Sequence, residues 1–335
     1  MTARVVVASG MHTNAAILDT CAYAYPLEIT IADLAGPAAA ASNTAGAEGV
    51  IVLTNPLPRS VIEAFADSVK IIGRAGVGLD AIDLEAAKER GIAVYHTPDY
   101  CVPEVATHTV AMILALNRRL FLADHVARSD WSNWRTLAPL PALSEQVVGL
   151  IGFGRIGKAV AALLRPLVAS VLAYDPHIAV DAPGIQPVDS LEELLTTSDY
   201  ISLHLPLTAE TVHLLGRAQL ASMRPGAALV NVSRAGLVDE EALVAALEGG
   251  HLSGAALDVL PGEPPSERSA ILRAPNLVLT PHVAWYSVES ERRLWEMTLT
   301  GMTAYFAGNE PPVGRLVPLG QASTSSPRPL TDDHI

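Results

Sequence analysis

Cysteine, aromatic residues and positive charge are all scarce in this chain of 335 residues. Its two cysteines, Cys21 and Cys101, are too few for a disulfide scaffold or a structural zinc site, and they fit a reducing cytosol. Because 35 acidic residues outnumber 22 Lys and Arg, the formal net charge is −13, and the field of the chain would repel phosphate. We therefore expect no nucleic acid or membrane as a partner, and no metal.

Long apolar runs are absent as well. The longest one in a helical pattern, 110–116, falls well short of the roughly 20 residues that a membrane span needs. The N-terminus shows no basic segment followed by an apolar core and a small-residue cleavage site, so no signal peptide is visible. These features predict a soluble, cytoplasmic protein.

What the chain does have is a large apolar fraction, 50%, arranged as short β-branched runs that alternate with longer amphipathic stretches. This alternation is typical of strands and helices that build parallel sheets. It occurs in two series, and the second is the sharper. Strands are expected at 4–8, 49–53, 70–72 and 92–95, then at 147–151, 170–174, 200–203, 227–232, 254–257 and 277–279. Helices are expected at 59–66, 84–89, 155–164, 191–195, 239–246 and 287–306, with a long one from about 102 to 127.

A G-x-G-x-x-G motif, formed by Gly152, Gly154 and Gly157, lies directly after an expected strand and opens an expected helix. The first glycine permits a tight turn, the second lets the backbone approach a pyrophosphate, and the third lets the helix pack close to the sheet. The helix N-terminus then offers amide donors and a favourable dipole to the phosphates. This arrangement predicts a dinucleotide site.

The choice of dinucleotide is indicated by Asp175, which ends the next expected strand 18 residues after Gly157. A carboxylate at about this spacing accepts hydrogen bonds from the ribose hydroxyls of NAD and repels the 2′-phosphate of NADP. NAD or NADH is therefore the expected cofactor. The alternative is that the glycines are ordinary strand-to-helix turns and that Asp175 is a solvated loop acid.

Three further side chains follow expected strands of the same series, where a parallel sheet gathers its ligand groups. Arg234 offers a planar fork of donors to a carboxylate and its adjacent carbonyl. His282 is a proton donor near neutral pH, and Glu263 would favour and orient the imidazolium if the two side chains touch. Each residue alone is more often structural or solvated, but their order and common placement favour carbonyl reduction.

Together these segments resemble the D-2-hydroxyacid dehydrogenases, in the order of that family and over 49–306. The resemblance rests on the glycine motif with Asp175, an N-x-x-R-like segment at Arg234, Leu-Asp-Val followed by Glu-Pro at Glu263, and Thr-Pro-His at His282. It implies Arg234, Glu263 and His282 as the catalytic residues, and Asp258 as the acid that holds the nicotinamide carboxamide. The other candidate cofactor contacts are Arg155, Ile156, Pro206, Val232, Ser233 and Thr109.

The resemblance also implies two doubly wound α/β domains, with a Rossmann NAD domain inserted into a flavodoxin-like substrate domain. The expected boundaries are 1–98 with 286–315 for the substrate domain and 99–285 for the NAD domain, followed by a flexible tail at 316–335. A homodimer built around the long helix at 102–127 is implied too.

The segments around Arg74, Tyr174 and His282 are most similar to the C-terminal binding proteins, transcriptional corepressors with a dehydrogenase fold, and to their bacterial relatives. In that branch the residues that match Arg74 and Trp285 line the substrate pocket. An NAD(H)-sensing scaffold with little catalysis is therefore an alternative to an enzyme. A dehydrogenase of an unusual acid, such as a phosphonate, is another.

The expected substrate is a small 2-oxo acid, or the 2-hydroxy acid in the reverse direction. Its carboxylate would lie between Arg74, the backbone amides of Gly76, Val77 and Gly78, and Arg234, with Asn55 a weaker candidate. NADH would deliver hydride to the carbonyl carbon while His282 protonates the oxygen. Trp285 suggests a pocket for an apolar side chain, although a Trp at such a position is as often core packing.

Overall fold

The computed structural model describes residues 2–10 and 13–318, and it divides the chain into two compact units. One unit comprises Met1–Tyr100 and Arg292–Ile335, and the other comprises Cys101–Glu291. The chain therefore leaves the first unit after Tyr100 and returns to it within its last helix. Among the described helices, none combines the length and the apolarity of a membrane span.

The first unit is built on a sheet with the strand order β13-β5-β4-β3-β1-β2, in which only β13 runs antiparallel to its neighbour. Its strands are β1 (Ala3–Ala8), β2 (Leu27–Ala32), β3 (Gly49–Val52), β4 (Ile71–Arg74), β5 (Ala93–His96) and β13 (Arg315–Leu316). Val6, Val50, Ile72 and Val94 are register partners across four adjacent strands and are all buried in one apolar cluster. This row of side chains fixes the register, because a slip by one residue would turn each of them to the other face.

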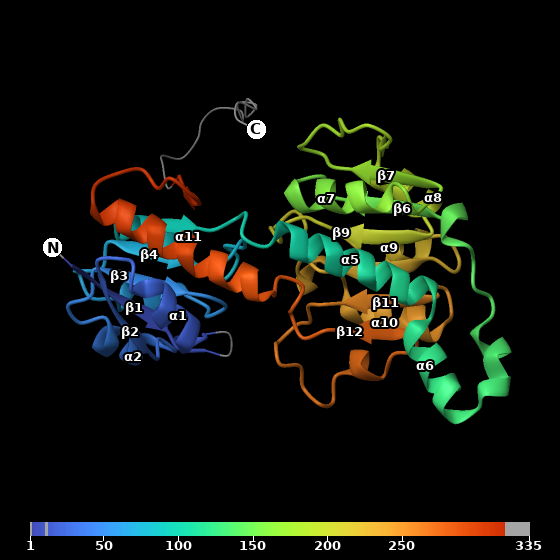
Figure 1. Ribbon diagram of the computed structural model, residues 1–335, viewed down its shortest axis with the longest axis horizontal. Coiled ribbons are helices and arrows are strands. Elements are labelled where there is room, and N and C mark those ends of the chain that lie inside the picture. The colour runs from blue at the N-terminus through green and yellow to red at the C-terminus, as the bar shows by residue number, and fades with distance from the viewer. Residues whose placement is uncertain (1, 11–12, 319–335) are drawn as a thin grey trace. The chain divides into compact units, whose positions relative to one another are not determined.

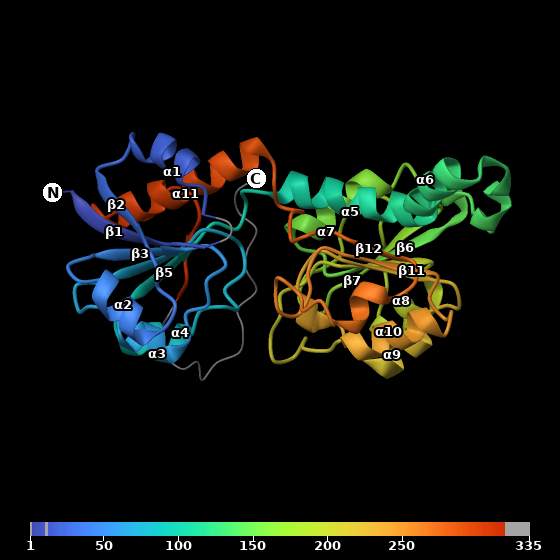
Figure 2. The same cartoon turned by 90° about the horizontal axis from the view of Figure 1, so that it is seen from below.

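Helices cover both faces of this sheet. They are α1 (Ala15–Ala22), α2 (Pro37–Asn43), α3 (Arg59–Glu63), α4 (Leu84–Glu89) and α11 (Val288–Phe306). The helices α1 and α11 lie on one face, and α2, α3 and α4 lie on the other (Figure 2). The hydroxyl of Tyr95, a fully buried residue of β5, donates to the carbonyl oxygens of Met297 in α11 and Val313, and this ties the returning chain to the sheet.

The second unit has a parallel sheet with the order β12-β11-β10-β9-β6-β7-β8. Its strands are β6 (Val147–Ile151), β7 (Ser170–Tyr174), β8 (Gln186–Pro187), β9 (Tyr200–Leu203), β10 (Ala228–Asn231), β11 (Gly254–Leu257) and β12 (Leu277–Leu279). The order of the strands along the chain reverses between β6 and β9. In open α/β sheets the ligand crevice lies at such a reversal, beside the carboxyl ends of the strands.

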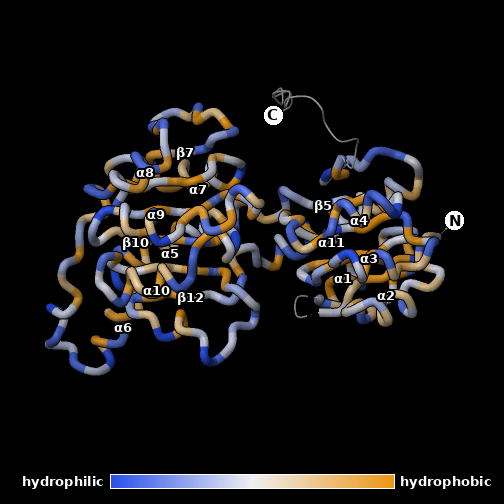
Figure 3. Tube along the Cα trace, turned by 180° about the vertical axis from the view of Figure 1, so that it is seen from behind, coloured by the Kyte–Doolittle hydropathy of each residue, from blue (hydrophilic) through white to orange (hydrophobic). Residues whose placement is uncertain are grey.

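The helices of the second unit form the outer layers, with α5 and α7 on one face and α8, α9 and α10 on the other (Figures 1 and 2). They are α5 (Val102–Asn117), α6 (Leu120–Ser129), α7 (Arg155–Leu164), α8 (Leu191–Thr197), α9 (Arg217–Ser222) and α10 (Glu240–Glu248). Short 3-10 helices are η1 (Trp131–Leu137), η2 (Leu143–Glu145), η3 (Ala235–Leu237) and η4 (Ala270–Arg273). Hydrophobic residues concentrate along the strands of each unit (Figure 3).

The predicted fold class, two doubly wound α/β domains, is confirmed by these two sheets. The long helix predicted over 102–127 is wrong in its last part, because the chain breaks at Arg119, which has a left-handed φ of 46° between α5 and α6. The predicted tail begins inside β13, where Leu316 pairs with Tyr95 and the Val317 amide donates to the Val94 carbonyl. The rest of that tail, 319–335, lies outside the described residues.

Candidate functional site

The glycine motif forms the turn between β6 and α7, and each glycine meets a different constraint. Gly152 has a φ of +98°, and a Cβ there would lie 2.5 Å from the carbonyl oxygen of His204. A Cβ on Gly157 would lie 2.3 Å from the carbonyl oxygen of Gly152, so α7 packs directly on the turn. A Cβ on Gly154 would meet nothing within 4 Å. The turn is therefore closed on the protein side and open where a pyrophosphate would approach the N-terminus of α7.

The carboxylate of Asp175, just after β7, lies beside this turn. Its Oδ2 accepts a hydrogen bond from the amide of Phe153 (2.8 Å), and its Oδ1 accepts from the amides of His177 (2.9 Å) and Ile178 (3.0 Å). These bonds hold the acid against the middle of the glycine motif, and Arg155 and Ile156 begin α7 on the other side of it. The set of residues fits the pyrophosphate and adenosine ribose of NAD.

The other predicted cofactor contacts are divided between the sheet edge and the core. Pro206 follows β9, the neighbour of β6, and Val232 and Ser233 follow β10, the next strand along, so all three lie at the same edge of the sheet as the glycine turn. The Ser233 hydroxyl donates to the Leu203 carbonyl (2.7 Å). Thr109 is fully buried in α5, and its hydroxyl donates to the Val105 carbonyl (2.7 Å), so it points into its own helix.

His204 was not among the predicted site residues, although it follows β9 directly and its backbone touches the glycine turn. Its ring nitrogens are buried, and neither has a hydrogen-bond partner within the described ranges. Burial lowers the pKa of His204 to about 3, because the charged imidazolium would be desolvated without compensation. The residue is therefore neutral across the physiological range.

Arg234, Glu263 and His282 come together at the carboxyl ends of β10, β11 and β12. His282 Nδ1 lies 2.6 Å from Glu263 Oε2, and Glu263 Oε1 accepts from the Leu260 amide (3.0 Å). The Arg234 backbone is held by Asn231, whose side-chain amide donates to the Arg234 carbonyl (2.9 Å). The predicted contact between the acid and the imidazole is thus present in the structure.

The charge of Glu263 is stabilised by its surroundings. Burial alone would raise the pKa of the Glu263 carboxyl, but the hydrogen bond and attraction of His282 outweigh it, with smaller help from the Leu260 amide and from Arg234. The net result is a pKa below the ordinary value for Glu. A carboxylate that accepts from Nδ1 fixes the proton on that atom and orients the imidazole ring.

Asp258 is buried, with 1% of its surface exposed, and its carboxylate binds the loop that carries His282. Its Oδ1 accepts from the Thr280 hydroxyl (2.5 Å) and the Val283 amide (2.9 Å), and its Oδ2 accepts from the Ala284 amide (2.9 Å). The role that the family resemblance implies for Asp258, binding of the carboxamide, stays a prediction. The sequence signal for this loop contact is Thr280 in the Thr-Pro-His motif, whose hydroxyl can donate to a buried carboxylate.

Trp285 also contacts this loop. Its indole Nε1 donates to the His282 carbonyl (2.9 Å), and its ring meets Tyr286 edge-on at 5.5 Å. The side chain is half-buried. Trp285 therefore anchors the histidine loop, in addition to any contact that it makes with a substrate.

The predicted carboxylate cradle belongs to the first unit, at the end of β4. Arg74 folds back over its own loop, where its Nε donates to the Gly78 carbonyl (2.9 Å) and Nη1 donates to the Ala75 carbonyl. The Gly76 amide donates to the hydroxyl of Thr97 (2.9 Å), so this amide is already used within the fold. Of the predicted backbone donors, the Val77 and Gly78 amides therefore remain the better candidates.

Asn55 lies after β3, where its side-chain amide donates to the Ser9 carbonyl (2.9 Å). Its Oδ1 is buried and has no hydrogen-bond partner in the part of the chain that the structure describes. The residue is therefore placed at the carboxyl ends of β1 and β3, the strands between which the order of this sheet reverses.

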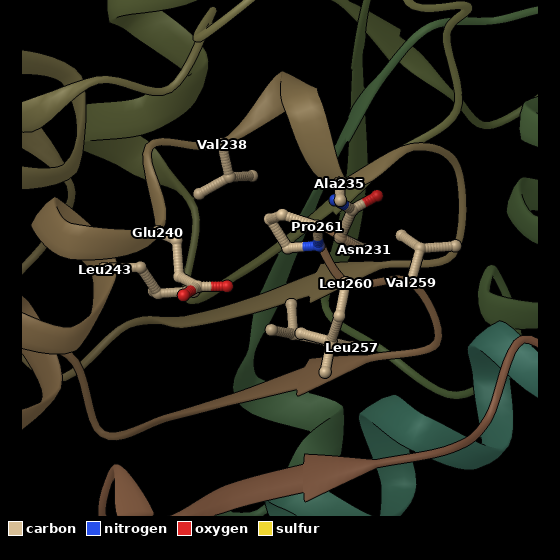
Figure 4. A pocket seen from close by; sticks show the side chains of 9 residues that line it. All are labelled: Asn231, Ala235, Val238, Glu240, Leu243, Leu257, Val259, Leu260 and Pro261. Atoms are coloured by element: carbon tan, nitrogen blue, oxygen red, sulfur yellow. The ribbon is translucent and has the colours of Figure 1, made fainter. Parts of the chain in front are cut away.

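A small pocket lies beside the segments that follow β10 and β11 in the second unit (Figure 4). Apolar side chains such as Leu243, Leu257 and Val259 line most of it, and Glu240 points inward from the start of α10 (Figure 4). Asn231, which holds the Arg234 backbone, forms part of its wall. Within the described ranges, no group of three or more His, Cys, Asp or Glu side chains could hold a metal ion.

Comparison with known proteins gives a consistent result. The family model "D-isomer specific 2-hydroxyacid dehydrogenase, NAD binding domain" matches residues 110–284. A glyoxylate reductase of Thermofilum pendens is 38% identical over 267 residues, which cover 78% of this chain and 78% of that protein.

Solved structures agree. An NADPH-dependent glyoxylate/hydroxypyruvate reductase from Sinorhizobium meliloti superposes with a TM-score of 0.84 at 30% identity, covering 94% of this chain and 97% of the other. A D-lactate dehydrogenase from Aquifex aeolicus, solved with NAD and lactic acid, gives a TM-score of 0.80 at 31% identity, covering 91% and 96%. The chain is thus similar to these proteins across both of its units.

The buried neutral His204 predicts a pH-dependent stability. Below about pH 6.5 the unfolded chain binds a proton that the folded chain excludes, so the free energy of unfolding falls by up to about 1.4 kcal/mol for each further pH unit. His204→Leu removes this difference. Denaturant unfolding at pH 7.5 and pH 5.5 should therefore show a shallower pH slope for His204→Leu than for the wild type. His177→Leu, which removes an exposed histidine, should keep the wild-type slope. An unchanged slope in His204→Leu would contradict the assignment.

Proposed function

The chain belongs to the D-isomer-specific 2-hydroxyacid dehydrogenase family, and we propose that it reversibly reduces a 2-oxo acid to the D-2-hydroxy acid with His282 as the acid and base. As a member of that family it is an NAD-dependent oxidoreductase. The observation that carries the proposal is the 2.6 Å hydrogen bond between His282 Nδ1 and Glu263. It orients the imidazole ring and places a charge-stabilising carboxylate behind it, and Nε2 is the atom that we propose exchanges a proton with the substrate.

In the proposed reaction, bound NADH supplies the hydride that reaches the carbonyl carbon. His282 Nε2 gives its proton to the carbonyl oxygen, and the imidazolium that precedes this step is stabilised by Glu263. In the oxidative direction the neutral imidazole takes the proton back. Glu263 stays ionised throughout, which fits the downward shift of its pKa.

Two arginines are proposed to bind the substrate. Arg234 would donate to the carbonyl and carboxylate oxygens, because its guanidinium carries a permanent charge and paired donors. Arg74, with the Val77 and Gly78 amides, would bind the carboxylate. Gly76 contributes through its lack of a side chain, since a Cβ there would lie 2.4 Å from Nη1 of Arg74.

We also propose that NAD is preferred over NADP. The support is Asp175, whose negative charge lies beside the glycine turn, with Pro176 and His177 after it and no arginine. The similar Sinorhizobium meliloti reductase is described as NADPH-dependent, so the preference has to be measured on this chain.

A homodimer is the proposed assembly. The support is a set of exposed apolar side chains on α6 and η1, with Phe121 65% exposed, Trp131 79% and Trp134 58%. Large exposed aromatic residues that cluster in one segment are typical of a protein interface.

A panel of 2-oxo acids, assayed with NADH and with NADPH, tests the function. We expect turnover with NADH, a weaker reaction with NADPH, and a higher kcat/KM for 4-methyl-2-oxovalerate or phenylpyruvate than for glyoxylate, because Trp285 favours an apolar side chain. A preference for glyoxylate would contradict the apolar pocket. No turnover with any acid would contradict the enzymatic function and favour an NAD(H)-sensing scaffold.

His282→Gln tests the acid and base. It should lower kcat by about 100-fold or more, the usual contribution of general acid–base catalysis, and change the Kd for NADH by less than about threefold. Stopped-flow turnover and the quenching of protein fluorescence by NADH measure the two quantities. Equal losses in both would indicate that the histidine is structural.

Phe121→Asp tests the dimer. Light scattering should give twice the chain mass of 35.2 kDa for the wild type and a mass near that of the monomer for the variant, because a buried charge opposes association. The control is Tyr23→Asp, at an aromatic residue that is 97% exposed in the first unit, which should stay dimeric. A monomeric wild type would overturn the assembly.

A further inference from the structure

A chain of three polar side chains connects helix α5 with the loop that carries His282. His108 lies in α5, one position before the buried Thr109, and its Nε2 is 3.0 Å from the hydroxyl oxygen of Thr280. That hydroxyl lies 2.5 Å from Asp258 Oδ1. None of these contacts belongs to the proposed proton transfer, yet Asp258 binds the amides on the far side of His282.

The directions of the hydrogen bonds in this chain follow from the groups themselves. An ionised carboxylate only accepts, so the single hydroxyl proton of Thr280 goes to Asp258. The oxygen of Thr280 can then only accept from His108, which requires a proton on His108 Nε2. The hydrogen bonds therefore all run in one direction, from the imidazole N–H of His108 through the hydroxyl of Thr280 to the buried carboxylate of Asp258.

These hydrogen-bonded side chains hold the loop of His282 in an unfavourable backbone conformation. His282 has a left-handed φ of 54°, a backbone conformation that a residue with a side chain rarely adopts unless its surroundings enforce it. The enforcing bonds run from the His282 amide to the Asp258 carbonyl (2.8 Å) and from the Val283 and Ala284 amides to the Asp258 carboxylate. The orientation of this carboxylate therefore decides where the imidazole lies.

We propose that His108 is a positioning residue for His282, acting through Thr280 and Asp258. Its N–H fixes the rotamer of the Thr280 hydroxyl, which fixes Asp258 Oδ1, which in turn holds the Val283 amide. Because His108 is partly exposed, at 24% of its side chain, while Asp258 is fully buried, the chain links a solvent-accessible position on α5 to the reacting loop. The catalytic meaning of this link rests on the function proposed above.

Paired substitutions separate hydrogen bonding from bulk. Thr280→Val and His108→Leu remove the donors, whereas Thr280→Ser keeps the hydroxyl and His108→Gln keeps an N–H near the place of Nε2. Thr196→Val, in α8, is the matched control, because the Thr196 hydroxyl donates to the carbonyl oxygens of Glu192 and Glu193 in its own helix. Hydrogen–deuterium exchange of peptides that span 282–286 and kcat with the best 2-oxo acid are the two measurements.

The donor-removing variants should raise amide exchange in 282–286 by about fivefold or more and lower kcat by about threefold to tenfold, because a misplaced imidazole transfers its proton less well. The conservative variants should restore both values to within about twofold of the wild type. The double variant His108→Leu with Thr280→Val should equal Thr280→Val alone, since His108 acts through Thr280.

Other results overturn the proposal. Amide exchange in 282–286 could be unchanged in His108→Leu, or it could rise equally throughout the second unit. Either result would show that His108 makes a general structural contact and does not position His282. If the wild type turns over no 2-oxo acid, the proposed function fails, but exchange still decides whether His108 positions the loop.

Discussion

The buried carboxylate of Asp258 is the constraint on which the arrangement around His282 depends. A charge in the core is tolerated only when hydrogen-bond donors surround it, and Asp258 obtains three of them from residues 280–284. To supply these donors the chain after β12 has to turn back on itself, and His282 takes the left-handed conformation at that turn. The position of His282 therefore follows from the way the loop folds around Asp258. Trp285 stabilises the same loop, because its indole donates to the His282 carbonyl.

The carboxyl edge of one parallel sheet brings the remaining groups together. Successive strands end at the glycine turn, at Asp175, at His204, at Ser233 and Arg234, at Asp258 and at Thr280. Parallel strands present these ends side by side, so residues far apart in sequence meet without any long loop. Glu263 is the exception, because it reaches His282 from the segment after β11 and is held there by the Leu260 amide.

The sequence predicted the second unit better than the first, for a physical reason. Buried parallel strands such as β6, β7 and β9 are short continuous apolar runs bounded by turns, and their predicted bounds agree with the structure. The edge strand β2 was not predicted, although its sequence alternates apolar and polar residues, because it is largely exposed and lacks the continuous apolar run of the buried strands. The helix break at Arg119 could not be predicted, because no glycine or proline stands at that position. Within the site, motif order predicted Arg234, Glu263 and His282, and the structure brings Glu263 and His282 into contact. The bond of Gly76 to Thr97 and the contacts of Asp258 could not be predicted, because they join segments that follow different strands and meet only in the fold.

The charge balance of the site reconciles an anionic substrate with a chain of net charge −13. Glu263 would repel a 2-oxo acid if it stood alone, but its charge is paired with the imidazole of His282 and is attracted by Arg234. With the imidazole protonated, the Glu263–His282 pair is neutral as a whole, so it does not oppose the attraction of Arg234 for an anion. A field of this kind acts within a few ångströms, where solvent screens little, whereas the negative surface acts at distances that salt screens. Capture of an anion is therefore set by these local groups and not by the sum over the chain.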